Sequence, residues 1–183
     1  MSSINPIHPS TRARTRLGPL VAAGLVLGVG LGGFVDGILL HQILQWHNML
    51  SSTYPPLDLV TMKYNMVWDG LFHALTWTMC VVGIGLLFAA GRRADVPWSG
   101  RLLVGSIFGG WGLFNLVEGL IDHELLGIHH VHPGRDQLAW DLGFVIAGGL
   151  GLMLIGYLVG RTGRRAEAPG RHGSQVSHTV DAR

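Results

Sequence analysis

The sequence predicts an all-α integral membrane protein, a four-helix transmembrane bundle built from two repeated helical hairpins, with both termini in the cytoplasm. Three observations predict this fold: four long apolar stretches, one carboxylate inside each stretch, and a polar pattern of the first stretch that returns in the third. Of the 183 residues, 48% are hydrophobic and 13% are charged, about half the usual charged share of a globular domain. The 28 glycines suit close packing of helices in lipid.

The apolar stretches are separated by segments that cannot continue a helix. Pro55-Pro56 interrupts the first connection, Gly91 and Pro97 lie in the second, and Pro133-Gly134 breaks the third. Each stretch between these breaks reaches the roughly 20 residues that cross a bilayer. We therefore expect helices at about residues 17–48, 61–90, 101–127 and 137–160.

Basic residues gather at three places along the chain, and these places predict the orientation in the membrane. They precede the first helix, separate the second from the third, and follow the fourth: Arg12, Arg14 and Arg16; Arg92, Arg93 and Arg101; Arg161, Arg164 and Arg165. The positive-inside rule puts all three groups in the cytoplasm. The transmembrane domain then covers residues 17–160, between a cytoplasmic tail of residues 1–16 and a disordered cytoplasmic tail of residues 161–183.

An internal repeat relates the first helix to the third. The acid, the glycine and both histidines fall in the same register in Val35-Asp36-Gly37, His41 and His47 and in Val117-Glu118-Gly119, His123 and His129. The second and fourth helices match more weakly, through Trp68-Asp69 and Trp140-Asp141. The chain therefore reads as two copies of one helical hairpin, as in membrane folds built from parallel repeats.

Each predicted helix carries one carboxylate within its apolar span: Asp36, Asp69, Glu118 and Asp141. An ionisable group inside a membrane costs roughly 2.5–3.5 kcal/mol on insertion scales, and it normally faces the protein interior with a partner. At a rise of about 1.5 Å per residue, all four acids lie in the half of the bilayer away from the cytoplasm. One acid per helix therefore predicts a shared interior site.

Histidines lie close to these acids, and imidazole together with carboxylate is a donor set that suits copper, zinc or iron. Four-helix bundles with a carboxylate from each helix are a known dinuclear metal architecture. Methionines near the outward ends, such as Met49, lean slightly toward copper. Cys80 is the only cysteine, which excludes an internal disulfide and any site with several cysteines. The candidate metal ligands are Asp36, His41, His47, Asp69, His73, Glu118, His123, His129 and Asp141.

The helical phase of the candidate ligands argues for two separate layers. In an ideal α-helix Asp36 and His41 are about 140° apart around the axis, and so are Glu118 and His123. We therefore expect a buried carboxylate-rich layer and a more exposed histidine-rich layer. The neighbouring loop histidines, His130 and His132, are expected to face water.

Three other interpretations of the cluster stay open. The repeat places His41 and His123 symmetrically, as axial ligands of a haem would be. The carboxylates and His73 could form a proton path. The cluster could also be a structural hydrogen-bond network in a non-catalytic membrane partner, for instance an assembly or metal-delivery factor for a respiratory complex. No nucleophile motif is present, so catalysis stays open, and a formal charge of +2 gives no reason to expect a nucleic-acid partner.

The string from Gly33 to His47, GFVDGILLHQILQWH, together with Asp69-Gly70-Leu71-Phe72-His73, resembles a family of bacterial predicted membrane proteins, the domain of unknown function 2243. The resemblance covers about residues 28–160, without either tail. It implies a multi-pass protein of four helices in the bacterial inner membrane. It implies no activity, so the chemistry expected above rests on the residues alone.

Overall fold

The computed structural model describes residues 15–166, and within that range the chain is helical and contains no strand. Four helices are long and apolar enough to cross a membrane, which confirms the predicted all-α membrane fold. Three of them combine α-helical and π-helical (η) segments, so eight elements make up the four spans: α1 (Gly18–Asp36), η1 (Gly37–Ile43), α2 (Leu59–Gly91), α3 (Gly100–Glu118), η2 (Gly119–Leu125), α4 (Gln137–Gly143), η3 (Phe144–Gly151) and α5 (Leu152–Ala166).

The helix ends differ from the predicted ones where the chain turns back on itself. The first span ends at Ile43 rather than at residue 48, because Gln45 takes a left-handed backbone conformation with φ of 50°. Gly127, with φ of 58°, turns the chain after the third span. The fourth span runs to Ala166, so the predicted tail begins later than residue 161; the rest of that tail and residues 1–14 lie outside the described residues.

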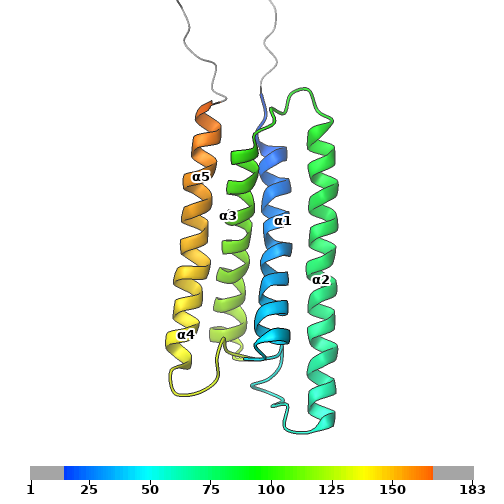
Figure 1. Ribbon diagram of the computed structural model, residues 1–183, viewed down its shortest axis with the longest axis vertical. Coiled ribbons are helices and arrows are strands. Elements are labelled where there is room, and N and C mark those ends of the chain that lie inside the picture. Colours follow the sequence, from blue (N-terminus) through cyan, green and yellow to red (C-terminus); the bar gives the residue numbers. More distant parts are fainter. Residues whose placement is uncertain (1–14, 167–183) are drawn as a thin grey trace, which may run out of the picture.

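The four spans lie side by side in a row, in the order α2, α1, α3, α5 (Figure 1). The first and third spans form the centre, α2 packs on α1, and α5 packs on α3. Among residues 15–166, α2 makes no close backbone contact with α3 or α5, so the row is open rather than closed into a ring. The central pair therefore provides most of the interior.

Glycines allow the neighbouring helices of the row to touch backbone to backbone. A Cβ atom on Gly28 of α1 would overlap the carbonyl oxygen of Ile107 in α3. A Cβ on Gly105 of α3 would lie 2.6 Å from the carbonyl oxygen of Gly156 in α5. Small residues at helix contacts are the usual device for bringing membrane helices this close.

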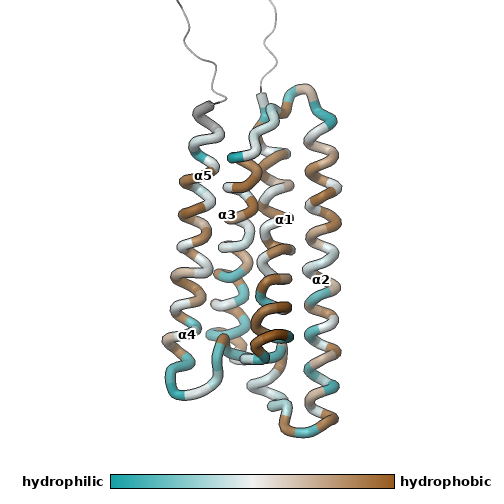
Figure 2. Tube along the Cα trace, viewed as in Figure 1, coloured by the Kyte–Doolittle hydropathy of each residue, from teal (hydrophilic) through white to brown (hydrophobic). Residues whose placement is uncertain are grey.

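The interior is apolar at one end of the row and polar at the other. The apolar end, where α1 begins and α5 ends, contains Leu20, Ala90 and Leu102 (Figure 1). Figure 2 shows hydrophilic residues on the opposite halves of α2 and α3 and on the loops beside them. The polar groups buried at that end are Asp36, His41, His47, Asn65, Asp69, Asn115, Glu118, His123, His129 and Asp141.

Candidate metal centre

The two π-helices bring each acid of the central helices next to its histidine. A π-turn joins residue i to residue i+5, so residues five apart lie over one another. Asp36 and His41 span the start of η1, and the Oδ2 and Nε2 atoms are 3.2 Å apart. Glu118 and His123 do the same at η2, at 2.8 Å between Oε1 and Nε2. The prediction of separate carboxylate and histidine layers is therefore wrong, because it assumed α-helical phase.

His47 and His129 enter the interior from the two loops beside it. Their rings are stacked, with centroids 4.7 Å apart and an interplanar angle of 11°. The Nδ1–H of His47 donates to the carbonyl oxygen of Val131 (2.9 Å), and that of His129 donates to the carbonyl oxygen of Met49 (3.0 Å). A carbonyl can only accept, so Nδ1 carries the proton in both rings. The Nε2 atom of a neutral His47 is then a lone-pair donor, whereas that of His129 lies 2.8 Å from Glu118 Oε1. Burial, reinforced by the His129 and His41 rings, lowers the pKa of His47 to about 3.

Asp69 and Asp141 lie behind the histidine rings of the central helices rather than among the inward-facing atoms. Asp69 Oδ1 is 3.0 Å from His41 Nδ1 and also accepts the backbone N–H of Met49 at 2.8 Å. Asp141 Oδ1 is 3.3 Å from His123 Nδ1. Each carboxylate therefore lies beside the Nδ1 atom of a histidine whose Nε2 faces the acid of its own helix. Asp69 is hydrogen-bonded to this atom of His41, whereas Asp141 lies close to that of His123 without a hydrogen bond.

The outcome is a buried group of donor atoms from both halves of the chain. The ligand atoms of His41, His47 and His129 lie within 4.8 Å of one another, and so do those of Glu118, His123 and His129. Several buried polar atoms of this group have no hydrogen-bond partner, namely Asp36 Oδ1, His41 Nε2, His47 Nε2, Glu118 Oε2 and both ring nitrogens of His123. Buried polar atoms without partners are rare in folded proteins, and each one needs an explanation.

The carboxylates of this group have only histidines as potential cationic partners among the described residues. Its four carboxylates are at most 6% exposed, and within residues 15–166 no Lys or Arg forms an ion pair with them. Glu118 Oε1 lies 2.8 Å from the Nε2 atoms of both His123 and His129. A carboxylate oxygen facing two imidazole nitrogens in a dry interior requires protons or metal ions between them.

The contacts of the first half of the chain recur in the second half. Asn48 donates to Asp69 Oδ2 at 2.8 Å, and the residue in the corresponding place, His130, contacts Asp141 Oδ2 at 2.7 Å. The backbone N–H of Met49 reaches Asp69, as that of Val131 reaches Asp141, at 2.8 Å and 2.9 Å. The histidine rings of the central helices each pack on a phenylalanine, in the pairs His41–Phe72 and His123–Phe144.

The family model described as "Predicted membrane protein (DUF2243)" matches residues 23–163, well over half of the chain. The chain belongs to this family. The description states a membrane protein and no activity, and the matched segment contains all the candidate ligands. No curated protein and no solved structure matches the chain significantly.

One predicted ligand of this DUF2243 protein lies apart from the others. His73 is on α2, and its Nδ1 is 2.7 Å from the carbonyl oxygen of Asp69 in the same helix. Its ring packs beside Gly37, where a Cβ would approach it to 2.8 Å, and it lines a separate shallow hollow. The structure therefore brings together eight of the nine candidates around one site, with His73 outside it.

Sequence reasoning also missed participants. His130 was expected to face water, but it contacts Asp141 and is half-buried. Asn48 occupies the matching position beside Asp69. Both directly follow the second histidine of the repeated pattern, and this shared position is the signal that would have identified them.

Proposed function

We propose that this protein binds two transition-metal ions through His41, His47, His123, His129, Asp36 and Glu118. The observation that carries the proposal is the convergence of donor atoms from four histidines. In three of them Nδ1 is hydrogen-bonded to an acceptor, and in His123 it lies 3.3 Å from Asp141 Oδ1. Metal-bound histidines almost always donate their other ring N–H to a carboxylate or a backbone carbonyl, which fixes the tautomer. Asp69 and Asp141 supply such carboxylates, so we assign them to orientation rather than to ligation.

Charge balance supports two ions rather than one. Two divalent cations would neutralise the four buried carboxylates while all four histidines stay neutral, as ligands must be. The first ion would lie at His41 and His47, whose ligand atoms come within 4.8 Å of each other and of His129, with Asp36, 3.2 Å from His41, as its acid. Glu118, His123 and His129 would hold the second.

The donor set narrows the choice among copper, zinc and iron. Imidazole and carboxylate suit all three metals, whereas copper(I) prefers sulfur ligands. None of the six proposed ligands carries sulfur, and Cys80 lies on α2 against Gly30, away from the donor group. This argues against copper(I) and leaves copper(II), iron and zinc, of which we propose iron or zinc.

A metal ion fits the group better than a haem does. The His47 ring lies 4.5 Å from the His41 ring and 6.2 Å from the His123 ring, measured between centroids. The space that a porphyrin between His41 and His123 would need is thus filled by His47 and, beside it, by His129. Haem ligation would require both loop histidines to leave.

Metal analysis of the purified protein tests the proposal. We expect about two iron or zinc ions per chain, and a loss of at least half of the metal in His47→Ala and in His129→Ala. His73→Ala is the matched control and should keep the full metal content, because His73 faces its own helix. Metal-free protein that stays folded, with an unchanged unfolding temperature when metal is added, would contradict the proposal and favour a proton-bound or purely structural network.

We also infer that the chain arose from a duplicated hairpin and sits in the bacterial inner membrane with its metal site facing outward. Arg92, Arg93 and Arg101 lie at the end of the row opposite the site, as the positive-inside rule requires for that orientation. In a chain with Cys80→Ala, an impermeant maleimide applied to intact cells should label Ser52→Cys and spare Ala94→Cys. Labelling of the reverse pattern would overturn the orientation.

A further inference from the structure

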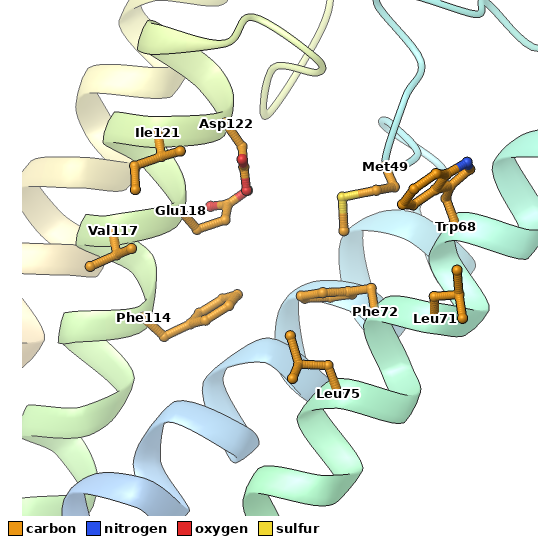
Figure 3. A pocket seen from close by; sticks show the side chains of 10 residues that line it. All are labelled: Met49, Trp68, Leu71, Phe72, Leu75, Phe114, Val117, Glu118, Ile121 and Asp122. Atoms are coloured by element: carbon orange, nitrogen blue, oxygen red, sulfur yellow. The ribbon is translucent and has the colours of Figure 1, made fainter.

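A cavity of about 380 Å³ lies between α2 and α3, directly beside the donor group. Its apolar walls come from both helices and are formed mainly by Leu71, Phe72, Leu75 and Phe114 (Figure 3). At one end of the cavity Glu118 and Asp122 project from the third span toward the space facing α2 (Figure 3). The volume falls in the range of small-molecule binding sites.

The cavity opens toward lipid. Leu71 and Leu75 are each 55% exposed, and both belong to a span long and apolar enough to cross the membrane. Val117 and Ile121 on the facing side are also more than 40% exposed. A ligand that enters between these side chains therefore arrives from the bilayer rather than from water, and it must be lipid-soluble.

The polar end of the cavity calls for a hydrogen-bond donor. The Glu118 Oε2 atom is fully buried at this end and has no hydrogen-bond partner, whereas the Asp122 side chain beside it is only half-buried and lines the cavity. Asp122, one turn further along, adds a second acidic group. An ionised carboxylate can only accept hydrogen bonds, so the head group that fits here carries an O–H or N–H.

The cavity walls break the similarity between the two halves of the chain. In the register that aligns Asp36 with Glu118 and Asp69 with Asp141, small or apolar residues stand where the cavity has bulky walls and an acid. Gly32, Leu40, Gly143 and Ala147 correspond to Phe114, Asp122, Leu71 and Leu75. Both halves share the residues proposed to bind metal. Metal binding therefore does not explain why bulky apolar side chains and Asp122 occur only on the side of the cavity.

We propose that this cavity binds a lipid-soluble aromatic alcohol, of the class of long-tailed phenols and quinols, with its hydroxyl at the acidic end formed by Asp122 and Glu118 and its tail toward the lipid. The Phe72 and Phe114 rings, with centroids 6.0 Å apart and 32° between their planes, provide a surface on which an aromatic ring can pack. The inference deepens the proposed function and rests on it in one respect: Glu118 is also a proposed metal ligand, so the hydroxyl would sit at the edge of the metal centre. Binding itself is measured independently of metal.

The test uses the full chain in lipid nanodiscs with tritiated 4-dodecylphenol, and protein-free discs as the blank. We expect saturable binding of one molecule per chain, and at least about tenfold weaker binding of dodecylbenzene, which has the same body without the hydroxyl. Equal binding of the two probes would overturn the proposal. It would mean that the cavity accepts any apolar chain, including the acyl chain of a bilayer lipid.

Variants of the wall locate the binding. Leu75→Trp fills the cavity and should weaken 4-dodecylphenol binding at least about tenfold, whereas Val82→Trp, on an exposed part of the same helix, should leave it unchanged. If Leu75→Trp does not fold, Leu71→Trp replaces it as the cavity-filling variant. Equal binding by the filled and control variants would overturn the proposal. Metal content is measured in every preparation. If the unaltered chain contains metal but does not bind 4-dodecylphenol, this inference fails and the metal centre stands. If it binds 4-dodecylphenol but contains no metal, the metal centre fails and this inference stands.

Discussion

At the scale of single residues, the side chains of the centre divide into groups that face inward and groups that hold them. His41 illustrates the division: its Nδ1 meets Asp69 at 3.0 Å, and its Nε2 faces Asp36 and the interior. The carbonyl oxygens of Val131 and Met49 serve the loop histidines in the same way. Each ring is therefore fixed at one nitrogen and available at the other.

The outer carboxylates should tune metal affinity without being required for metal binding. Asp69→Asn and Asp141→Asn keep the side-chain shape but remove the charge behind His41 and His123. We expect each substitution to weaken metal affinity by about 10- to 100-fold, as loss of such supporting partners does in other metal sites. Competition with a metal chelator of known affinity measures the change.

The control for these variants is Asp136→Asn, an exposed acid at the start of the fourth span. It should bind metal as tightly as the unaltered chain. If Asp69→Asn abolished binding outright, as substitution of a ligand would, the assignment of Asp69 to orientation would be contradicted.

Most of these residues were predictable, because an acid or a buried histidine in an apolar span is costly and seldom occurs without a role. Their division of labour was not. Whether Asp69 binds metal or holds His41 depends on which ring nitrogen it meets, and the sequence carries no information on ring orientation. His73 looked like a ligand from its spacing on α2, yet its Nδ1 is hydrogen-bonded to the backbone carbonyl oxygen of Asp69, one turn earlier in the same helix.

At the scale of elements, the π-helices decide the geometry of the centre. A π-turn holds one residue more than an α-turn, because its hydrogen bond runs from i to i+5 instead of i to i+4. This extra residue aligns Asp36 with His41 and Glu118 with His123. The acid-to-histidine spacing of five was visible in the sequence, but hydrogen-bond registers have no reliable residue signature, so an α-helix was the natural expectation.

Removing the extra residue from η1 should convert it into an α-helix without moving His41 far from Asp36. We expect deletion of Leu39, a lipid-exposed residue of η1, to keep the metal content. Leu31 is equally exposed but lies in the regular α-helical part of α1, which has no extra π-helical residue whose loss could compensate for a deletion. Its deletion should rotate the rest of the span by about 100° and abolish metal binding.

Metal analysis and circular dichroism of the two deletions check this expectation. Helix content should stay similar in both proteins, so a difference in metal content reports the rotation. Equal metal content in the two would show that the π-segment does not set the position of His41.

At the scale of the whole molecule, the glycine contacts fix the order of the row and therefore bring both halves of the centre together. The sequence predicted four spans, since apolar length alone identifies them. It did not predict which helices touch, because nearly every face of these spans is apolar and only the backbone contacts at positions such as Gly28 distinguish neighbours. The central position of α1 and α3 places their acids and histidines face to face.

Widening the central contact should destabilise the whole protein. Gly28→Leu forces α1 away from the backbone of α3, and we expect it to cost about 3 kcal/mol or more of folding free energy. Gly85→Leu is the matched control, because a side chain there meets open space. Unfolding in mild detergent should occur at clearly lower temperature for Gly28→Leu alone, and equal unfolding temperatures would contradict the importance of this contact.

X-ray absorption at the edge of the bound metal tests the central claim most directly. The proposed centre predicts nitrogen and oxygen ligands with the outer-shell scattering of imidazole rings, no sulfur, and a second metal at about 3.5–4 Å. That imidazole signal should weaken in His47→Ala. A spectrum with sulfur ligands, with a porphyrin pattern, or without imidazole scattering would contradict the account.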